Sequence, residues 1–106
     1  MARVLVVFDD LLLGSNVLGM LRAAGHEAEL TSGADVRPEG FDVLVVDLGA
    51  GTFDGVAIDR GSARAIGVYS HVDVATKERA EAAGFDLVVP RSRMAREGAA
   101  LVQRMS

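Results

Sequence analysis

The fold is decided by the stretch Phe41-Asp-Val-Leu-Val-Val-Asp47-Leu-Gly-Ala-Gly-Thr-Phe-Asp54-Gly55. Its β-branched run, Val43 to Val46, is typical of a strand that is buried on both faces of a parallel sheet. The strand ends in a carboxylate, Asp47, at the point where the chain breaks into glycines. Because open parallel sheets bind ligands at this carboxyl edge, we expect Asp47 to belong to a functional site.

A second acidic group follows the first predicted strand. The run Val4-Leu-Val-Val-Phe8 ends in Asp9-Asp10. If the two strands are neighbours in the sheet, three carboxylates meet at one edge. Held within about 4–6 Å of each other they would repel strongly unless a cation lay among them. The sequence therefore predicts a metal ion or a basic side chain at this edge.

Composition indicates a single domain spanning residues 1–106. No apolar run approaches the ~20 residues that span a bilayer, so we expect a soluble, cytoplasmic protein without a membrane partner. The chain has no cysteine, which excludes a disulfide framework, a thiolate zinc site and a cysteine nucleophile. Its net charge of −4 argues against binding to nucleic acid.

Strand and helix patterns alternate along the whole chain. We predict strands at residues 3–8, 26–31, 42–47, 65–70 and 86–89, and long helices at residues 13–24, 74–83 and 94–105. The connections at 32–40 and 54–61 have room for a brief helical turn at most, so the second and third helices are shortened. This pattern predicts a flavodoxin-like, doubly wound α/β fold with five parallel strands in the order 2-1-3-4-5.

Polar residues stand at the ends of four predicted strands, in the order Asp9-Asp10, Asp47, Ser70 and Arg91. This set resembles the receiver domain of bacterial response regulators (CheY-like), and the likeness covers essentially the whole chain. Asp54-Gly55 also stands seven and eight residues beyond Asp47, as in that family. The family's Lys after strand five, seven residues beyond a Gly, corresponds here to Arg91.

The resemblance implies a phosphoryl-transfer site, in which positioning and charge neutralisation matter most. Asp47 would accept the phosphoryl group, Ser70 would donate its hydroxyl to a phosphoryl oxygen, and Arg91 would face the remaining negative charge. The chain would then be a stand-alone receiver that signals through protein contacts, with no enzymatic activity beyond self-catalysed phosphoryl transfer and dephosphorylation.

The resemblance also implies Mg²⁺ as the cofactor, because this ion prefers oxygen ligands and takes few carboxylates. Asp10 and Asp47 would ligate the ion directly, Asp9 through water, and the backbone carbonyl of Gly49 would complete the set. The implied phosphodonor is a histidine kinase or a phosphotransfer protein. A homodimer is a further implied partner, and the output partner stays open.

Several departures from the family pattern favour an alternative, a non-phosphorylated pseudo-receiver that acts as an interaction or dimerisation module. Arg91 is planar and bidentate, so it could clamp Asp47 in the absence of phosphate. Ser92 replaces a common Pro, Val88 replaces an aromatic switch residue, and His71 follows Ser70 where a small residue is typical. A third hypothesis is an unrelated flavodoxin-like enzyme or cofactor binder.

Two further segments carry expectations. His26 follows the helix-ending Gly25, so we expect a surface residue. Leu11-Leu12-Leu13 cannot all face the core, and an exposed leucine here could form a docking spot for a partner.

Overall fold

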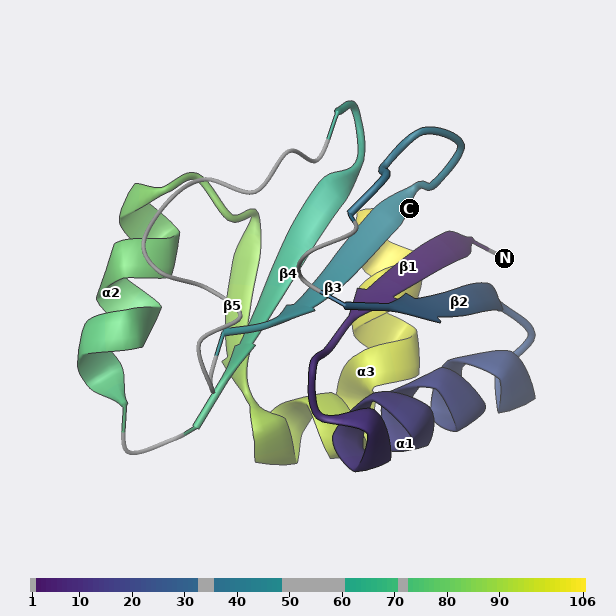
Figure 1. The fold of residues 1–106 in the computed structure, drawn as a ribbon, viewed down its shortest axis with the longest axis horizontal. Coiled ribbons are helices and arrows are strands. Elements are labelled where there is room, and N and C mark those ends of the chain that lie inside the picture. The colour runs from purple at the N-terminus through teal and green to yellow at the C-terminus, as the bar shows by residue number, and fades with distance from the viewer. Residues whose placement is uncertain (1, 33–35, 49–60, 71–72) are drawn as a thin grey trace.

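A computed structural model describes residues 2–32, 36–48, 61–70 and 73–106. In these ranges, five parallel strands form one sheet in the order β2-β1-β3-β4-β5 (Figure 1). The strands are β1 (Arg3–Val7), β2 (Glu27–Thr31), β3 (Val43–Asp47), β4 (Arg64–Tyr69) and β5 (Leu87–Pro90), and the helices are α1 (Leu11–Ala23), α2 (Val74–Ala82) and α3 (Arg91–Met105). The predicted flavodoxin-like α/β fold and its strand order are confirmed.

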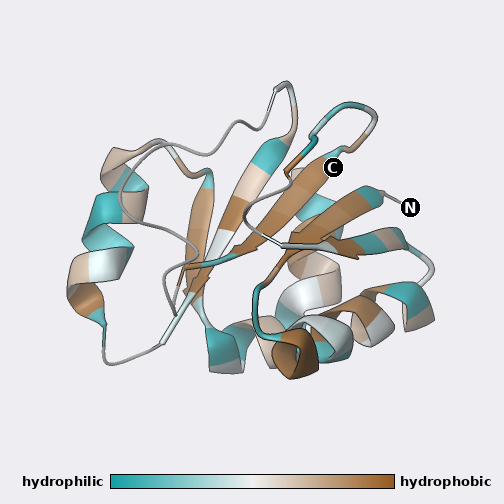
Figure 2. Cartoon of the chain, in the orientation of Figure 1, coloured by the Kyte–Doolittle hydropathy of each residue, from teal (hydrophilic) through white to brown (hydrophobic). Residues whose placement is uncertain are grey.

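The central strand β3 explains the apolar run in the sequence. Successive side chains of a strand point to opposite faces of the sheet. Val43 and Val45 pack into a core shared with α1 and α3, whereas Leu44 and Val46 pack into a second core on the α2 side. All four side chains are buried, and Figure 2 shows the continuous hydrophobic band that the inner strands form. Helices therefore cover both faces of the sheet.

Helix α3 begins three residues earlier than predicted, at Arg91 instead of Met94. Pro90 is both the last residue of β5 and the N-cap of α3, with φ of −70° and ψ of 158°. Proline has no N–H to leave unbonded at this position, and its fixed φ suits the entry to a helix. No loop separates β5 from α3, so Arg91 is held in the first turn of a helix.

The expectation that His26 lies on the surface is wrong, because its side chain is buried. Gly25, with φ of +93°, closes α1 in a Schellman motif in which the N–H of His26 donates to the carbonyl of Leu21 at 3.0 Å. This turn directs the imidazole inward. Its Nδ1 accepts a hydrogen bond from the N–H of Ala2 at 3.0 Å, and Nε2 lies 3.3 Å from the carbonyl oxygen of Ala99 in α3.

The start of α1 places two leucines in solvent. Leu11 is 70% exposed and Leu12 is 74% exposed, whereas Leu13 packs against the α1–α3 core. The helix begins at Leu11, two residues before the predicted start, because Asp10 caps it. None of the helices in the described ranges is long and apolar enough to cross a membrane.

The structure describes only part of the two connections that were predicted to be short. Residues 36–42, between β2 and β3, contain no helix. The predicted short helix at 54–61 lies outside the described residues except for Gly61.

Two glycines of α1 allow a matched stability test of how closely this helix packs on the sheet. A Cβ at Gly14 would lie 2.8 Å from Leu30 Cδ1 and 3.0 Å from Phe8 Cβ, whereas a Cβ at Gly19 would meet nothing within 4 Å. Gly19→Ala should raise the free energy of unfolding by roughly 0.5–1 kcal/mol, because alanine loses less backbone entropy. Gly14→Ala should lower it by roughly 1–3 kcal/mol through overpacking. Urea unfolding followed by circular dichroism measures both, and equal effects would contradict the close contact of α1 with the sheet.

Candidate functional site

Asp47 lies at the carboxyl end of the central strand, and its side chain is 0% exposed. The strand register pairs Asp47 with Val68 of β4 and pairs the preceding Val46 with Val7 of β1. Because side chains alternate along a strand, Asp47 shares a face with Val43 and Val45, the face that α1 and α3 cover. The carboxylate is therefore buried between the sheet and these two helices.

Arg91 supplies the positive charge beside this carboxylate. Its Nη2 lies 3.4 Å from Asp47 Oδ1, and its side chain is 41% exposed. At this separation the attraction is mainly electrostatic, because the distance is long for a hydrogen bond. Arg91 Nε is buried and finds no acceptor among the described residues. At this edge, where the sequence predicts a metal ion or a basic side chain, the structure places a guanidinium that is permanently charged.

Asp9 and Asp10 follow β1 at the same edge of the sheet, but both are exposed. Asp10 Oδ1 accepts hydrogen bonds from the N–H groups of Leu12 at 3.0 Å and Leu13 at 3.1 Å. These N–H groups have no partner within the helix, and an aspartate directly before the first turn satisfies them. The Asp10 carboxylate is thus engaged in capping α1.

The predicted ligands Asp9, Asp10 and Asp47 match Mg²⁺ in chemistry, since this ion prefers carboxylate and water ligands. Among the residues that the structure describes, no group of three or more histidine, cysteine, aspartate or glutamate side chains is placed to hold a metal ion. Gly49, the fourth predicted ligand, lies outside the described residues. The convergence of Asp9, Asp10 and Asp47 on one ion stays a prediction.

The remaining predicted site residues lie around this edge. Ser70 directly follows β4 and is partly buried, and its carbonyl accepts a hydrogen bond from the N–H of Asp73 at 2.8 Å. Val88 packs into the core on the α2 side, so it lies on the face opposite Asp47. His71, together with Asp54 and Gly55, lies outside the described residues.

A capping role for Asp73 was not predicted from the sequence, although an Asp directly before a helical run is a signal for a helix N-terminus. Its carboxylate caps α2: Oδ2 accepts a hydrogen bond from the Thr76 hydroxyl at 2.5 Å, and Oδ1 accepts one from the Thr76 N–H at 3.2 Å. The hydroxyl hydrogen bond is the main cause that lowers the pKa of Asp73, and nearby Arg79 adds to it. Because the N–H of this capping residue donates to the carbonyl of Ser70, Ser70 is linked to the start of α2.

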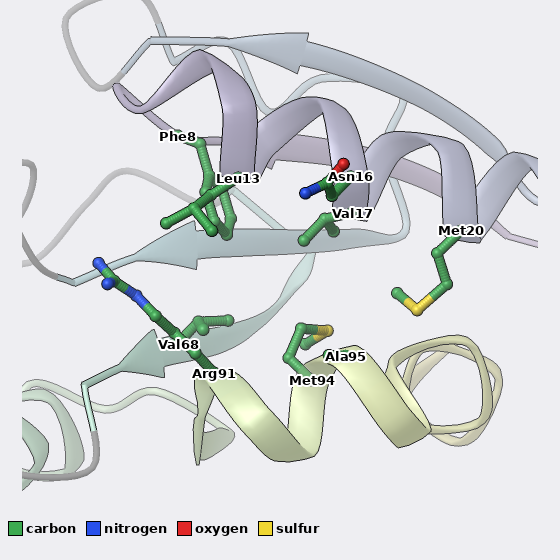
Figure 3. Close-up of a pocket in the computed structure, with 9 residues that line it drawn as sticks. All are labelled: Phe8, Leu13, Asn16, Val17, Met20, Val68, Arg91, Met94 and Ala95. Carbon is green, nitrogen blue, oxygen red and sulfur yellow. The ribbon is translucent and has the colours of Figure 1, made fainter.

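A cavity of about 220 Å³ opens between α1 and α3, next to the Asp47–Arg91 pair. Figure 3 shows Leu13, Asn16, Val17 and Met20 on the α1 side, with Arg91 at one end. Met94 and Ala95 line the α3 side, and Phe8 and Val68 complete the wall. Sequence patterns could not locate this cavity, because it depends on the spacing of two helices that are far apart in the chain.

Comparison with solved structures finds the same fold in response-regulator receiver proteins. The chain superimposes on a DNA-binding response regulator of the LuxR family from Staphylococcus aureus with a TM-score of 0.82 and 14% identity, covering 99% of this chain and 98% of that one. A response regulator receiver domain protein from Clostridium thermocellum gives a TM-score of 0.81 and 17% identity, with coverage of 99% and 94%.

A third match is an atypical orphan response regulator for which a phosphorylation-independent regulatory mechanism is described. Its TM-score is 0.73 with 17% identity, covering 97% of this chain and 93% of that one. No protein-family model matches the sequence, and no curated protein matches it. At these identities the likeness establishes the fold.

The capping role of Asp10 predicts a difference between two substitutions. Asp10→Ala should lower the free energy of unfolding by about 1 kcal/mol, because two N–H groups lose their acceptor. Asp10→Asn should cost only a few tenths of that amount, since asparagine caps nearly as well. Urea unfolding of both variants, with Asp9→Ala as the neighbouring control, provides the measurement. Equal losses for the alanine and asparagine variants would exclude capping as the dominant role.

The Asp47–Arg91 pair predicts strong coupling in a double-mutant cycle. Arg91→Met should destabilise the protein by roughly 1–3 kcal/mol, because a buried carboxylate loses a compensating charge. Adding Asp47→Asn should recover much of this loss, giving a coupling energy of about 1 kcal/mol or more. Urea unfolding at neutral pH measures the cycle, and Arg96→Met, an exposed position of the same helix, is the control. Additive losses would show that the two side chains do not interact.

Proposed function

We propose that this chain is a receiver-type signalling domain that accepts a phosphoryl group on Asp47 and passes the signal on through protein–protein contacts. The observation that supports it most is a buried carboxylate at the carboxyl edge of a receiver-type sheet, with Arg91 Nη2 at 3.4 Å. This edge is where open parallel sheets bind ligands. A nucleophile placed there beside a permanent cation suits phosphoryl transfer, which depends on positioning and charge neutralisation.

The transfer step is a displacement at phosphorus. A carboxylate oxygen of Asp47 forms a bond to the phosphorus of a phosphohistidine, and the bond from phosphorus to the histidine nitrogen breaks. The electron pair of that bond stays with the leaving imidazole. Arg91 faces the negative charge on the transferred group, and Ser70 donates its hydroxyl to one phosphoryl oxygen. Self-catalysed hydrolysis returns Asp47 to its free form.

Mg²⁺ remains part of this proposal as an ion that would add positive charge at the same edge. Asp9, Asp10 and Asp47 would hold it together with the carbonyl of Gly49. Because Asp10 already caps α1, its share in the ion would compete with the first turn of the helix. Arg91 already lies beside Asp47, so its positive charge needs no such rearrangement.

The proposed phosphodonor is a histidine kinase or a phosphotransfer protein, which would place the domain in the cytoplasm. Leu11 and Leu12 offer that partner an apolar contact, because both are exposed and directly follow Asp10. A homodimer or a separate output protein would receive the signal.

A second candidate is a pseudo-receiver that signals without phosphate. Two observations favour it: the Asp47 side chain is 0% exposed, and Arg91 already neutralises it. An attacking group must be reached by its donor, so Asp47 would need to be uncovered before transfer. The similar atypical orphan regulator described as phosphorylation-independent is a precedent for this behaviour on the same fold.

Incubation with Mg²⁺ and a small phosphodonor separates the two candidates. Phosphoryl transfer predicts one added phosphoryl group by intact mass, labile to base and absent from Asp47→Asn. Arg91→Met should slow its appearance on the order of 10²-fold or more, because a preorganised charge at the reacting group is lost. Glu39→Gln, an exposed acid-to-amide change elsewhere, is the matched control and should react normally.

No adduct with either a small phosphodonor or a phosphorylated histidine partner would support the pseudo-receiver. Calorimetric titration with Mg²⁺ measures separately whether the protein binds the ion and whether Asp10 is one of its ligands. Asp10→Asn keeps the helix cap but removes a charge, so it should weaken Mg²⁺ binding if Asp10 is a ligand. An unchanged affinity in that variant would remove Asp10 from the metal site.

A further inference from the structure

We propose that the cavity between α1 and α3 binds a small apolar carboxylic acid, with the carboxylate at Arg91 and the hydrocarbon body over Val17, Val68 and Met94. Nothing in this inference requires Asp47 to be phosphorylated, so it goes beyond the proposed function. Three features of the cavity carry it: the chemistry of its walls, its size and the position of its one charged side chain.

The walls are predominantly apolar. Leu13 and Val17 of α1 face Met94 of α3 across the cavity, and Val68 of β4 contributes from the sheet (Figure 3). Asn16 supplies a single polar amide. Apolar walls with a few polar groups are typical of sites for small molecules, in which burial gives affinity and the polar groups fix orientation.

The size of the cavity limits the ligand. Its volume of about 220 Å³ lies below the range of roughly 300–1,000 Å³ typical of drug-sized ligands. At about 30 Å³ for each water of the liquid, it corresponds to roughly seven waters. We therefore expect a ligand on the order of ten non-hydrogen atoms.

Close packing of the two helices closes one end. A Cβ at Gly98 would lie 2.5 Å from Met94 Sδ and 2.6 Å from Met20 Cε, so α3 and α1 already touch at this point. Figure 3 places Met20 at the end of the cavity opposite the Arg91 guanidinium. A ligand would thus have its apolar end at Met20 and its polar end at Arg91.

Arg91 determines the ligand's charge. Among the residues that line the cavity, all within the described ranges, it is the one charged side chain. Its Nε is buried without an acceptor in the described part of the chain, and a guanidinium binds a carboxylate through paired N–H donors. A carboxylic acid would give the guanidinium a negatively charged partner at this end of the cavity, whereas an alcohol of the same length is neutral.

Binding at Arg91 is coupled to Asp47, because the same guanidinium pairs with that carboxylate at 3.4 Å. The two anions compete for one cation, so a bound carboxylate weakens the Asp47–Arg91 pair. By linkage, removing the charge of Asp47 must strengthen ligand binding by the corresponding factor. An apolar cavity that did not use Arg91 would show no such effect.

The test is a titration of the ¹⁵N-labelled protein with sodium octanoate, below its micelle-forming concentration, and in parallel with 1-octanol. We expect saturable shifts in α1 and α3 with octanoate and weaker binding of octanol. Arg91→Met should weaken octanoate on the order of tenfold and leave octanol nearly unchanged. Asp47→Asn should tighten octanoate several-fold without affecting octanol.

Two variants on α3 separate occupation of the cavity from surface binding. Ala95→Leu adds bulk at an exposed position that lines the cavity and should abolish binding of both probes, whereas Ala100→Leu, an exposed position of the same helix that does not line it, should bind like the parent. Equal affinity for octanoate and octanol, or unchanged octanoate binding in Arg91→Met, would overturn the inference. Concentration-dependent dimerisation that Ala95→Leu abolishes would also overturn it, by assigning the cavity to a second copy of the chain.

Discussion

The structure depends on neutralising one carboxylate, that of Asp47, which the most buried strand of the sheet carries into apolar surroundings. The side chain is 0% exposed, and removing an ion of this kind from water costs several kcal/mol unless a partner compensates. Arg91 is that partner, and its position in the first turn of α3 follows from the direct passage of β5 into the helix. The pair thus joins the end of the central strand to the first turn of α3, at one end of the cavity between α1 and α3.

Sequence patterns were sufficient to predict the strands and their order, because the apolar runs that mark the strands are local and strong. The β-branched run Val43 to Val46 predicts a strand buried on both faces, and the structure places its side chains in two separate cores. Asp47 and Arg91 could be predicted to approach each other because both stand at strand ends, and parallel strands end at the same edge.

Other features escaped prediction because they depend on competition between partners. From the sequence, Asp10 was considered only as a metal ligand, whereas in the structure its carboxylate caps α1, whose first N–H groups lie two and three residues away. His26 was expected on the surface, yet the Schellman turn at Gly25 directs its imidazole inward, between the N–H of Ala2 and the carbonyl of Ala99 in α3. Helix α3 likewise begins earlier than predicted, because Pro90 both ends β5 and caps the helix.

The direct junction of β5 and α3 has a mechanical consequence. A loop would absorb a shift of Arg91 locally, but here the residue is the first of a 15-residue helix that is about 22 Å long. If the guanidinium moves away from Asp47 by more than a rotamer change, the whole rod must pivot about Pro90. A shift of the charged end of α3 would then reach Met105 at the other end, because the helix would move as one rod.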